Sequence, residues 1–232
     1  MKKLGLIGGI GPESTVKYYQ QIIKSYRTRL STEAYPDFLI RSIDMTEMLR
    51  YVSQNELDGL TEFLGGHLTE LEKSGVEVSA LASNTPHIVF DRLRGLSGLQ
   101  LISIVEEACK AIDSTGAKTV ALFGTKSTMT AGFYQKEAEK HSLNIILPDE
   151  EQMDFIHKVY FEELVFKKID PNTKAKLIQI CHDMSSKDEI EGLILGGTEL
   201  SLILEQSDFE NLTVFDTTQI HVEAIVTEIL KT

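Results

Sequence analysis

The segment LGLIGGIGPEST, residues 4–15, places a short aliphatic run directly before three glycines and a proline–glutamate pair. A run of this length that ends in glycine predicts a strand buried on both faces, followed by a tight turn. Proline and glutamate suit the first turn of a helix, so a helix is expected next. The segment VALFGTKSTMT, residues 120–130, repeats the arrangement about 115 residues later. We therefore expect the same strand–turn–helix unit twice.

A second pair of segments has nearly the same spacing. LASNTPH, residues 81–87, is matched by LILGGTEL, residues 193–200. Between these segments, apolar runs alternate with stretches of helical period, which is typical of a parallel sheet covered by helices. The expected strands are 4–8, 38–43, 76–82, 100–102, 119–123, 144–147, 192–195 and 213–215. The expected helices are 13–30, 57–73, 105–114, 133–141, 154–168, 173–184 and 218–230.

The sequence therefore predicts an α/β fold of two pseudo-symmetric domains, each a doubly wound parallel sheet, with the active site in the cleft between them. The glycine-rich segment 95–99 suggests the first crossing between the domains, and residues 207–211 suggest the return. The expected first domain is discontinuous and comprises residues 1–97 and 210–232. The expected second domain comprises residues 98–209.

Composition and charge exclude several classes of function. The formal charge of −12, without a run of basic residues, opposes the binding of nucleic acid. No apolar run reaches the roughly 18 residues of a membrane span, and no leader-like segment precedes the first strand, so we expect a cytoplasmic protein without a membrane partner. Cys109 and Cys181 lie among apolar residues at helical spacing, which favours packing thiols over nucleophiles. We expect no metal, because no zinc-ligand spacing is present.

Ligands of parallel sheets bind beyond the carboxyl ends of the strands. Five loops rich in glycine, hydroxyls and carboxamides are expected there: GGIGPEST, ASNTPH, FGTKST, GGTEL and FDTTQIH. The first lacks the lysine and the spacing of a phosphate-binding loop. A small anion suits such donors, although in ASNTPH and GGTEL the polar side chains are equally well explained as caps of the following turns. His87 is more typical of a structural histidine than of an acid or base.

The motifs MKKLGLIGGIGPESTVKYY, ASNTPHIVFD, FGTKSTMTAGFY, LILGGTELSLIL and FDTTQIHVEA resemble, in order, those of the aspartate/glutamate racemase family. The resemblance implies a homodimer of two-domain chains that needs no pyridoxal phosphate or other cofactor. It also implies the racemisation of a small amino acid or dicarboxylic acid, aspartate or glutamate above all. In that chemistry two bases on opposite faces of the substrate remove and return the α-proton.

The resemblance also assigns site residues. Ser83 and Gly197 occupy the positions of the two family cysteines, which act as the bases. Residues matching substrate-binding positions are Gly9, Ser14, Asn84, Thr85, Thr198 and Glu199. Arg50 and either Lys167 or Lys168 lie where the family often places a cation for the distal carboxylate, and a solvated surface role explains each of them equally well.

Without thiols at these positions, several explanations are open. Another group, such as His87, Glu199 or Glu13, acts as the base. Alternatively, the protein binds a carboxylate without turnover, or is an isomerase or decarboxylase of a related diacid with one base. A substitution introduced at Ser83 or Gly197 to silence the enzyme is a further explanation. An unassisted serine hydroxyl is a poor base near pH 7, and glycine has no side chain.

Overall fold

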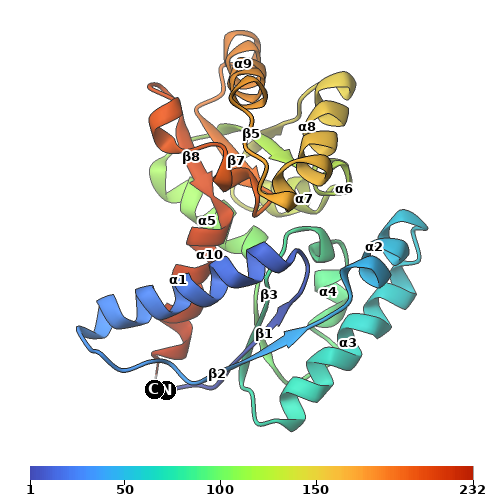
Figure 1. Ribbon diagram of the computed structural model, residues 1–232, viewed down its shortest axis with the longest axis vertical. Coiled ribbons are helices and arrows are strands. Elements are labelled where there is room, and N and C mark those ends of the chain that lie inside the picture. Colours follow the sequence, from blue (N-terminus) through green and yellow to red (C-terminus); the bar gives the residue numbers. More distant parts are fainter. Residues whose placement is uncertain (232) are drawn as a thin grey trace. The chain divides into compact units, whose positions relative to one another are not determined.

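The chain folds into two compact α/β units, shown in the computed structural model of Figure 1. The structure describes residues 1–231. Unit 1 comprises residues 1–104 together with the chain from Thr218 onward, and unit 2 comprises Val105–Thr217. The chain therefore leaves unit 1, completes unit 2, and returns.

Each unit contains one parallel sheet of four strands. Unit 1 has β1 (Leu4–Gly8), β2 (Phe38–Ser42), β3 (Val78–Leu81) and β4 (Gln100–Ile102), in the order β2-β1-β3-β4. Unit 2 has β5 (Thr119–Gly124), β6 (Asn144–Ile146), β7 (Gly192–Gly196) and β8 (Thr213–Asp216), in the order β6-β5-β7-β8. The identical order of the two sheets confirms the predicted fold class of two pseudo-symmetric, doubly wound α/β halves.

The helices follow the alternation that a parallel sheet requires. They are α1 (Pro12–Leu30), α2 (Met45–Ser53), α3 (Leu57–Lys73), α4 (Phe90–Leu93), α5 (Ile104–Thr115), α6 (Lys126–Thr130), α7 (Phe133–Glu139), α8 (Glu150–Glu162), α9 (Pro171–Asp188) and α10 (Thr217–Ile229). Short 3₁₀ turns are η1 (Thr85–Val89), η2 (Leu164–Phe166), η3 (Leu200–Leu202) and η4 (Gln206–Asp208).

The sheet of unit 1 is buried on both faces. Alternate residues of a strand point to opposite faces, so Leu4 and Leu6 pack with side chains of α1 and α10. Ile7 instead belongs to the core that α2, α3 and α4 complete. This burial on both sides explains why the strands are continuous aliphatic runs in the sequence.

Unit 2 repeats this arrangement with its own helices. Phe123 of β5 and Leu195 of β7 pack against α8 and α9. Helix α8 begins with a capping box, in which Asp149 accepts from the N–H of Gln152 and the Gln152 side chain accepts from the N–H of Asp149. This box places the start of α8 at residue 150, four residues before the predicted start.

Each of the two predicted domain boundaries assigns one strand to the wrong unit. Residues 100–102 pair with β3 of unit 1, although the prediction gave them to the second domain. Residues 213–216 pair with β7 of unit 2, although the prediction returned them to the first domain. In each half the chain crosses only after its fourth, edge strand is complete. The glycines at 95–99 and the polar segment 207–211 turn the chain into that strand rather than out of the unit.

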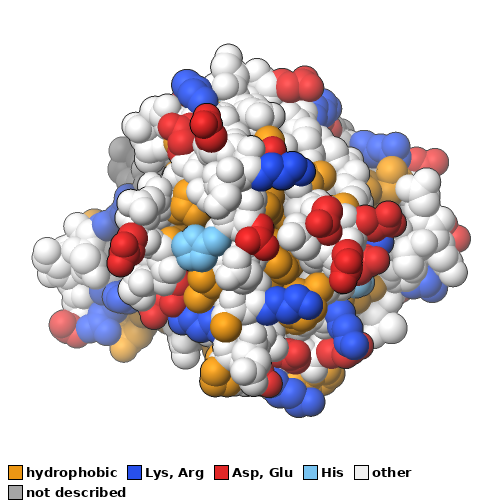
Figure 2. All heavy atoms as spheres, turned by 90° about the horizontal axis from the view of Figure 1, so that it is seen from above, with side chains coloured by type: hydrophobic (Ala, Val, Ile, Leu, Met, Phe, Trp, Pro, Cys, Tyr) orange, Lys and Arg blue, Asp and Glu red, His pale blue; other side chains and the backbone are white. Residues whose placement is uncertain are grey.

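The surface is charged without a dominant basic region on the face that Figure 2 shows, where Lys and Arg side chains are interspersed with Asp and Glu. Among the described residues, no helix combines the length and apolar character needed to cross a membrane.

Candidate functional site

Each unit carries candidate site loops at the carboxyl ends of its own central strands. In a sheet of order 2-1-3-4 the connections from the two central strands leave toward opposite faces, and a crevice opens between their loops. In unit 1 these strands are β1 and β3, and in unit 2 they are β5 and β7. Four of the five loops expected from the sequence follow these strands.

The loop after β1 has a backbone that only glycine suits. Gly9 has a φ of +86°, and a Cβ at this residue would lie 2.4 Å from the carbonyl oxygen of Ile43. Its N–H donates to Thr15 Oγ1 at 2.7 Å. The hydroxyl of Ser14 donates to the carbonyl of Ala82 at 2.9 Å, which joins this loop to the end of β3.

The loop after β3 brings three predicted binding residues together. Ser83, Asn84 and Thr85 are all buried, with exposed fractions of 7%, 2% and 7%. Asn84 stands at the N-cap position of η1, but its side chain makes no capping hydrogen bond there. Capping is therefore the wrong explanation for Asn84.

His87, considered above as a base, is a structural residue of unit 1. Its ring stacks on Phe90 at 4.6 Å, and its Nε2 accepts from the N–H of Ile104 at 3.3 Å. Burial, reinforced by the nearby His221, lowers the pKa of His87 to about 3. A neutral imidazole with its acceptor nitrogen already occupied is a poor base near pH 7.

In unit 2, the loop after β7 carries Gly197, Thr198 and Glu199. Thr198 and Glu199 are 3% and 2% exposed. Thr198 Oγ1 donates to Glu199 Oε2 at 2.6 Å, and the hydroxyl of Tyr160 from α8 donates to the same oxygen. The structure thus holds a buried carboxylate one residue beyond Thr198.

Tyr160 is the site residue that sequence reasoning missed. A Cβ at Gly197 would lie 2.4 Å from Cε2 of the Tyr160 ring. In the sequence, Tyr160 sits at helical spacing from Ile156 and reads as an ordinary core position. No local motif links it to Gly197, because the contact arises only when α8 packs against β7.

The predicted cations are exposed. Arg50 Nη1 pairs with Glu56 Oε2 at 2.9 Å, and the guanidinium stacks on Tyr51. Lys167 ends η2 with a φ of 55°, and Lys168 lies over the ring of Phe166. Arg50 is therefore already engaged locally, whereas the two lysines stand at an exposed turn of unit 2.

The two cysteines are packing thiols, as predicted. Both side chains are fully buried, and burial raises the pKa of each thiol to about 12. A thiol with so high a pKa has almost no thiolate near neutral pH. Within residues 1–231, no three His, Cys, Asp or Glu side chains gather in a way that could hold a metal ion.

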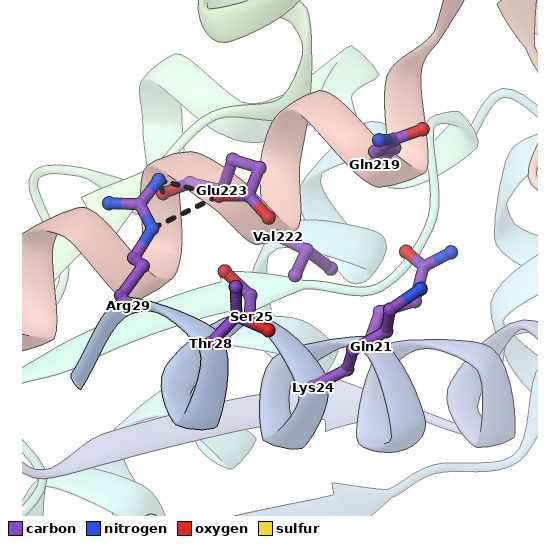
Figure 3. A pocket seen from close by; sticks show the side chains of 8 residues that line it. All are labelled: Gln21, Lys24, Ser25, Thr28, Arg29, Gln219, Val222 and Glu223. Carbon is purple, nitrogen blue, oxygen red and sulfur yellow. Dashed lines mark hydrogen bonds and ion pairs between the residues drawn. The ribbon is translucent and has the colours of Figure 1, made fainter. Parts of the chain in front are cut away.

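A separate hollow of about 280 Å³ lies in unit 1 between α1 and α10. Figure 3 shows its lining, with Arg29 of α1 paired to Glu223 of α10. None of the predicted site residues lines it. This hollow is therefore distinct from the loops at the strand ends.

Comparisons with known proteins identify the family and agree with the fold. The chain is similar to an aspartate racemase homologue of Pyrococcus horikoshii (35% identity, TM-score 0.87) and to a structure described as a putative Asp/Glu racemase of Yersinia pestis (29%, TM-score 0.91), each over all of both chains. It is also 26% identical to the broad-specificity amino-acid racemase RacX of Bacillus subtilis, over 89% of each chain. The family model described as Asp/Glu/Hydantoin racemase matches residues 7–225. The chain therefore belongs to the Asp/Glu/Hydantoin racemase family.

Proposed function

We propose that this protein interconverts the L and D forms of an amino acid, aspartate or glutamate above all, without a cofactor. The observation that carries the proposal is the set of buried hydroxyl and amide groups at the central strand ends, Ser83, Asn84, Thr85 and Thr198, in a chain of this family. The α-proton of an amino acid is very weakly acidic. Donors fixed around the substrate carboxylate stabilise the carbanion that its removal creates.

The base we propose is Glu199. Of the three groups considered from the sequence, His87 is neutral and already accepts a hydrogen bond, and Glu13 is half-buried in the first turn of α1. Glu199 is a buried side chain two residues beyond Gly197, held by two hydroxyl donors. In the proposed step the Cα–H bond breaks, the proton passes to a Glu199 oxygen, and the electron pair moves into the substrate carboxylate. A proton delivered by water to the opposite face inverts the centre, whereas a proton returned by Glu199, after exchange with solvent, to the same face exchanges the proton only.

The proposal for a diacid needs a cation at the distal carboxylate. The proposed cations are Arg50, which is exposed and paired with Glu56, and either Lys167 or Lys168 at an exposed turn of unit 2. The expected homodimer, the expected cytoplasmic location and the expected single active site stay predictions.

A second candidate is a binder of small carboxylates without turnover. The observation that favours it is that Ser83 and Gly197 carry no thiol, whereas the family resemblance implies a cysteine base at each of these positions. The binding residues are the same in both candidates, so only a measurement of proton transfer separates them.

The test is proton NMR of L- and D-aspartate and L- and D-glutamate in heavy water with the wild-type protein, together with chiral analysis of the product. Loss of the α-proton signal with inversion supports the racemase. Binding without loss of that signal contradicts the racemase and supports the binder. Exchange without inversion, or release of carbon dioxide, supports a one-base isomerase or decarboxylase instead.

A further inference from the structure

Position 197 is not an empty place left by a lost side chain. A Cβ there would lie 2.4, 3.2 and 3.3 Å from three carbons of the Tyr160 ring. Real Cβ contacts are essentially never shorter than 3.0 Å. The backbone of Gly197 is not left-handed, because Gly197 is not among the described residues that have a positive φ. Glycine is therefore required at residue 197 by the lack of room for a side chain, and not by backbone strain.

The Tyr160 ring is held in this place from both ends. It is 8% exposed and belongs to the core between α8, α9 and the sheet. The rings of Tyr160 and Phe161 make an edge-to-face contact with 5.4 Å between their centroids, and the Tyr160 hydroxyl donates to Glu199. A ring fixed at both ends cannot move aside cheaply for a side chain at residue 197.

The hydroxyl of Tyr160 also fixes Glu199. It shares the acceptor Oε2 with the hydroxyl of Thr198. Burial, and after it the charge of Glu199, raises the pKa of Tyr160 well above its usual value. Tyr160 therefore stays protonated, and its hydroxyl acts as a hydrogen-bond donor. Two hydroxyl donors on one oxygen hold the carboxylate in a single orientation.

We propose that the Tyr160 ring replaces a side chain at position 197 by filling the volume it would take, and that the Tyr160 hydroxyl orients Glu199 for proton transfer. Tyr160 is thereby a positioning residue that acts through Glu199. This inference rests on the proposed function only in its second half, because the exchange of volume between residues 160 and 197 does not depend on activity.

The first half is tested by a double-mutant cycle in thermal unfolding. Gly197→Ala is expected to lower Tm by about 5 °C in the wild-type background, the cost of overpacking a core. In a Tyr160→Leu background, which removes Cε2 but keeps an apolar side chain, the same change is expected to lower Tm by less than about 1 °C. Gly66→Ala is the matched control, since a Cβ there meets nothing within 4 Å. An equal decrease in Tm in both backgrounds overturns the proposal that the Tyr160 ring fills the volume of a side chain at residue 197.

The second half is tested by α-proton exchange in Tyr160→Phe, which keeps the ring and removes the hydroxyl. Exchange is expected to slow at least about tenfold in kcat with KM unchanged, because Glu199 loses a donor that orients it while the groups that bind substrate are kept. Tyr134→Phe, another buried tyrosine of unit 2, is the control and keeps the wild-type kcat and KM. An unchanged kcat in Tyr160→Phe, or an equal loss in Tyr134→Phe, overturns the positioning role.

The two failures are distinguishable. If the wild-type protein exchanges no α-proton, the proposed racemase and the positioning role both fail. The replacement of volume is then still decided by the thermal cycle. If the wild type exchanges and the cycle is additive, the racemase stands and the replacement is wrong.

Discussion

The loops after β3 and β7 hold the same place in two sheets of the same strand order, but different groups stand behind them. Behind the loop of Ser83 is a pair of neutral, buried imidazoles, His87 and His221. Behind the loop of Gly197 is a tyrosine that binds a buried carboxylate. The repeat therefore preserves the path of the backbone while each half acquires its own chemistry.

The largest expected effect comes from restoring the thiols on both sides. Ser83→Cys with Gly197→Cys is expected to racemise on the order of 100-fold faster in a Tyr160→Leu background than with Tyr160 retained, because only the former gives the second thiol room. Chiral chromatography of aspartate and glutamate measures the rates. Tyr160→Leu alone is the control. Equal rates for the two thiol variants would show that the ring does not obstruct residue 197.

Acid is expected to weaken unit 1 through its imidazoles. Burial lowers the pKa of His221 to about 4 and that of His87 to about 3, below the usual 6.5. Below pH 6.5 these two histidines therefore bind protons in the unfolded chain but stay neutral in the folded chain. As a result, the free energy of unfolding falls as pH falls. At pH 5 the loss is about 2 kcal/mol for each histidine.

Denaturant unfolding at pH 7 and pH 5 measures this loss. His221→Gln is expected to remove about 2 kcal/mol of the difference between the two pH values. His182→Gln, at an exposed position, is the matched control and leaves it unchanged. A wild-type pH dependence in His221→Gln would mean that His221 is not neutral in the folded protein.

Replacement of the buried Asn84 amide tests whether the loop after β3 binds substrate or has only a structural role. Asn84→Ala is expected to raise the Kd for aspartate or glutamate about tenfold, the cost of one lost hydrogen bond to a carboxylate. Isothermal titration calorimetry measures it, with exposed Asn211→Ala as the control. An unaltered Kd would move the substrate away from the β3 loop.

The smallest expected effect comes from Gly66, a position where, unlike Gly197, the surroundings leave room for a side chain. Gly66 lies in α3, and a Cβ there would meet nothing within 4 Å. Gly66→Ala is expected to raise the free energy of unfolding by up to about 1 kcal/mol, because alanine favours a helix. Chemical denaturation measures the gain, and a loss of stability would reveal a contact at this face of α3.

Most of the fold is predictable from the sequence because the strands are aliphatic runs that end in glycine or a polar residue. The repeat predicts that two halves exist, but the crossings were misplaced since glycine-rich turns look alike inside a unit and between units. The short helix α2 was missed, although Asp44 caps it by accepting from the N–H of Thr46 and Glu47. Its nine residues give too little periodicity to stand out.

The candidate site is predictable only as far as it follows local motifs. Asn84, Thr198 and Glu199 are predicted as site residues because each lies within three residues of the end of a central strand. Tyr160 is not found, because its part in the site comes from packing between distant segments. Nor does a sequence pattern distinguish an imidazole such as His87, buried and neutral, from one poised for catalysis.

The return of the chain to unit 1 has a consequence for synthesis. The apolar face formed by Leu4, Leu6 and Val78 is covered in part by α10, through Val222 and Ile225. Those residues leave the ribosome only after all of unit 2. At usual elongation rates this delay is on the order of ten seconds. Unit 2 is free to fold as it emerges, whereas the first-made half waits with one face of its sheet only partly covered, by α1, which makes it the part of the nascent chain most in need of a chaperone.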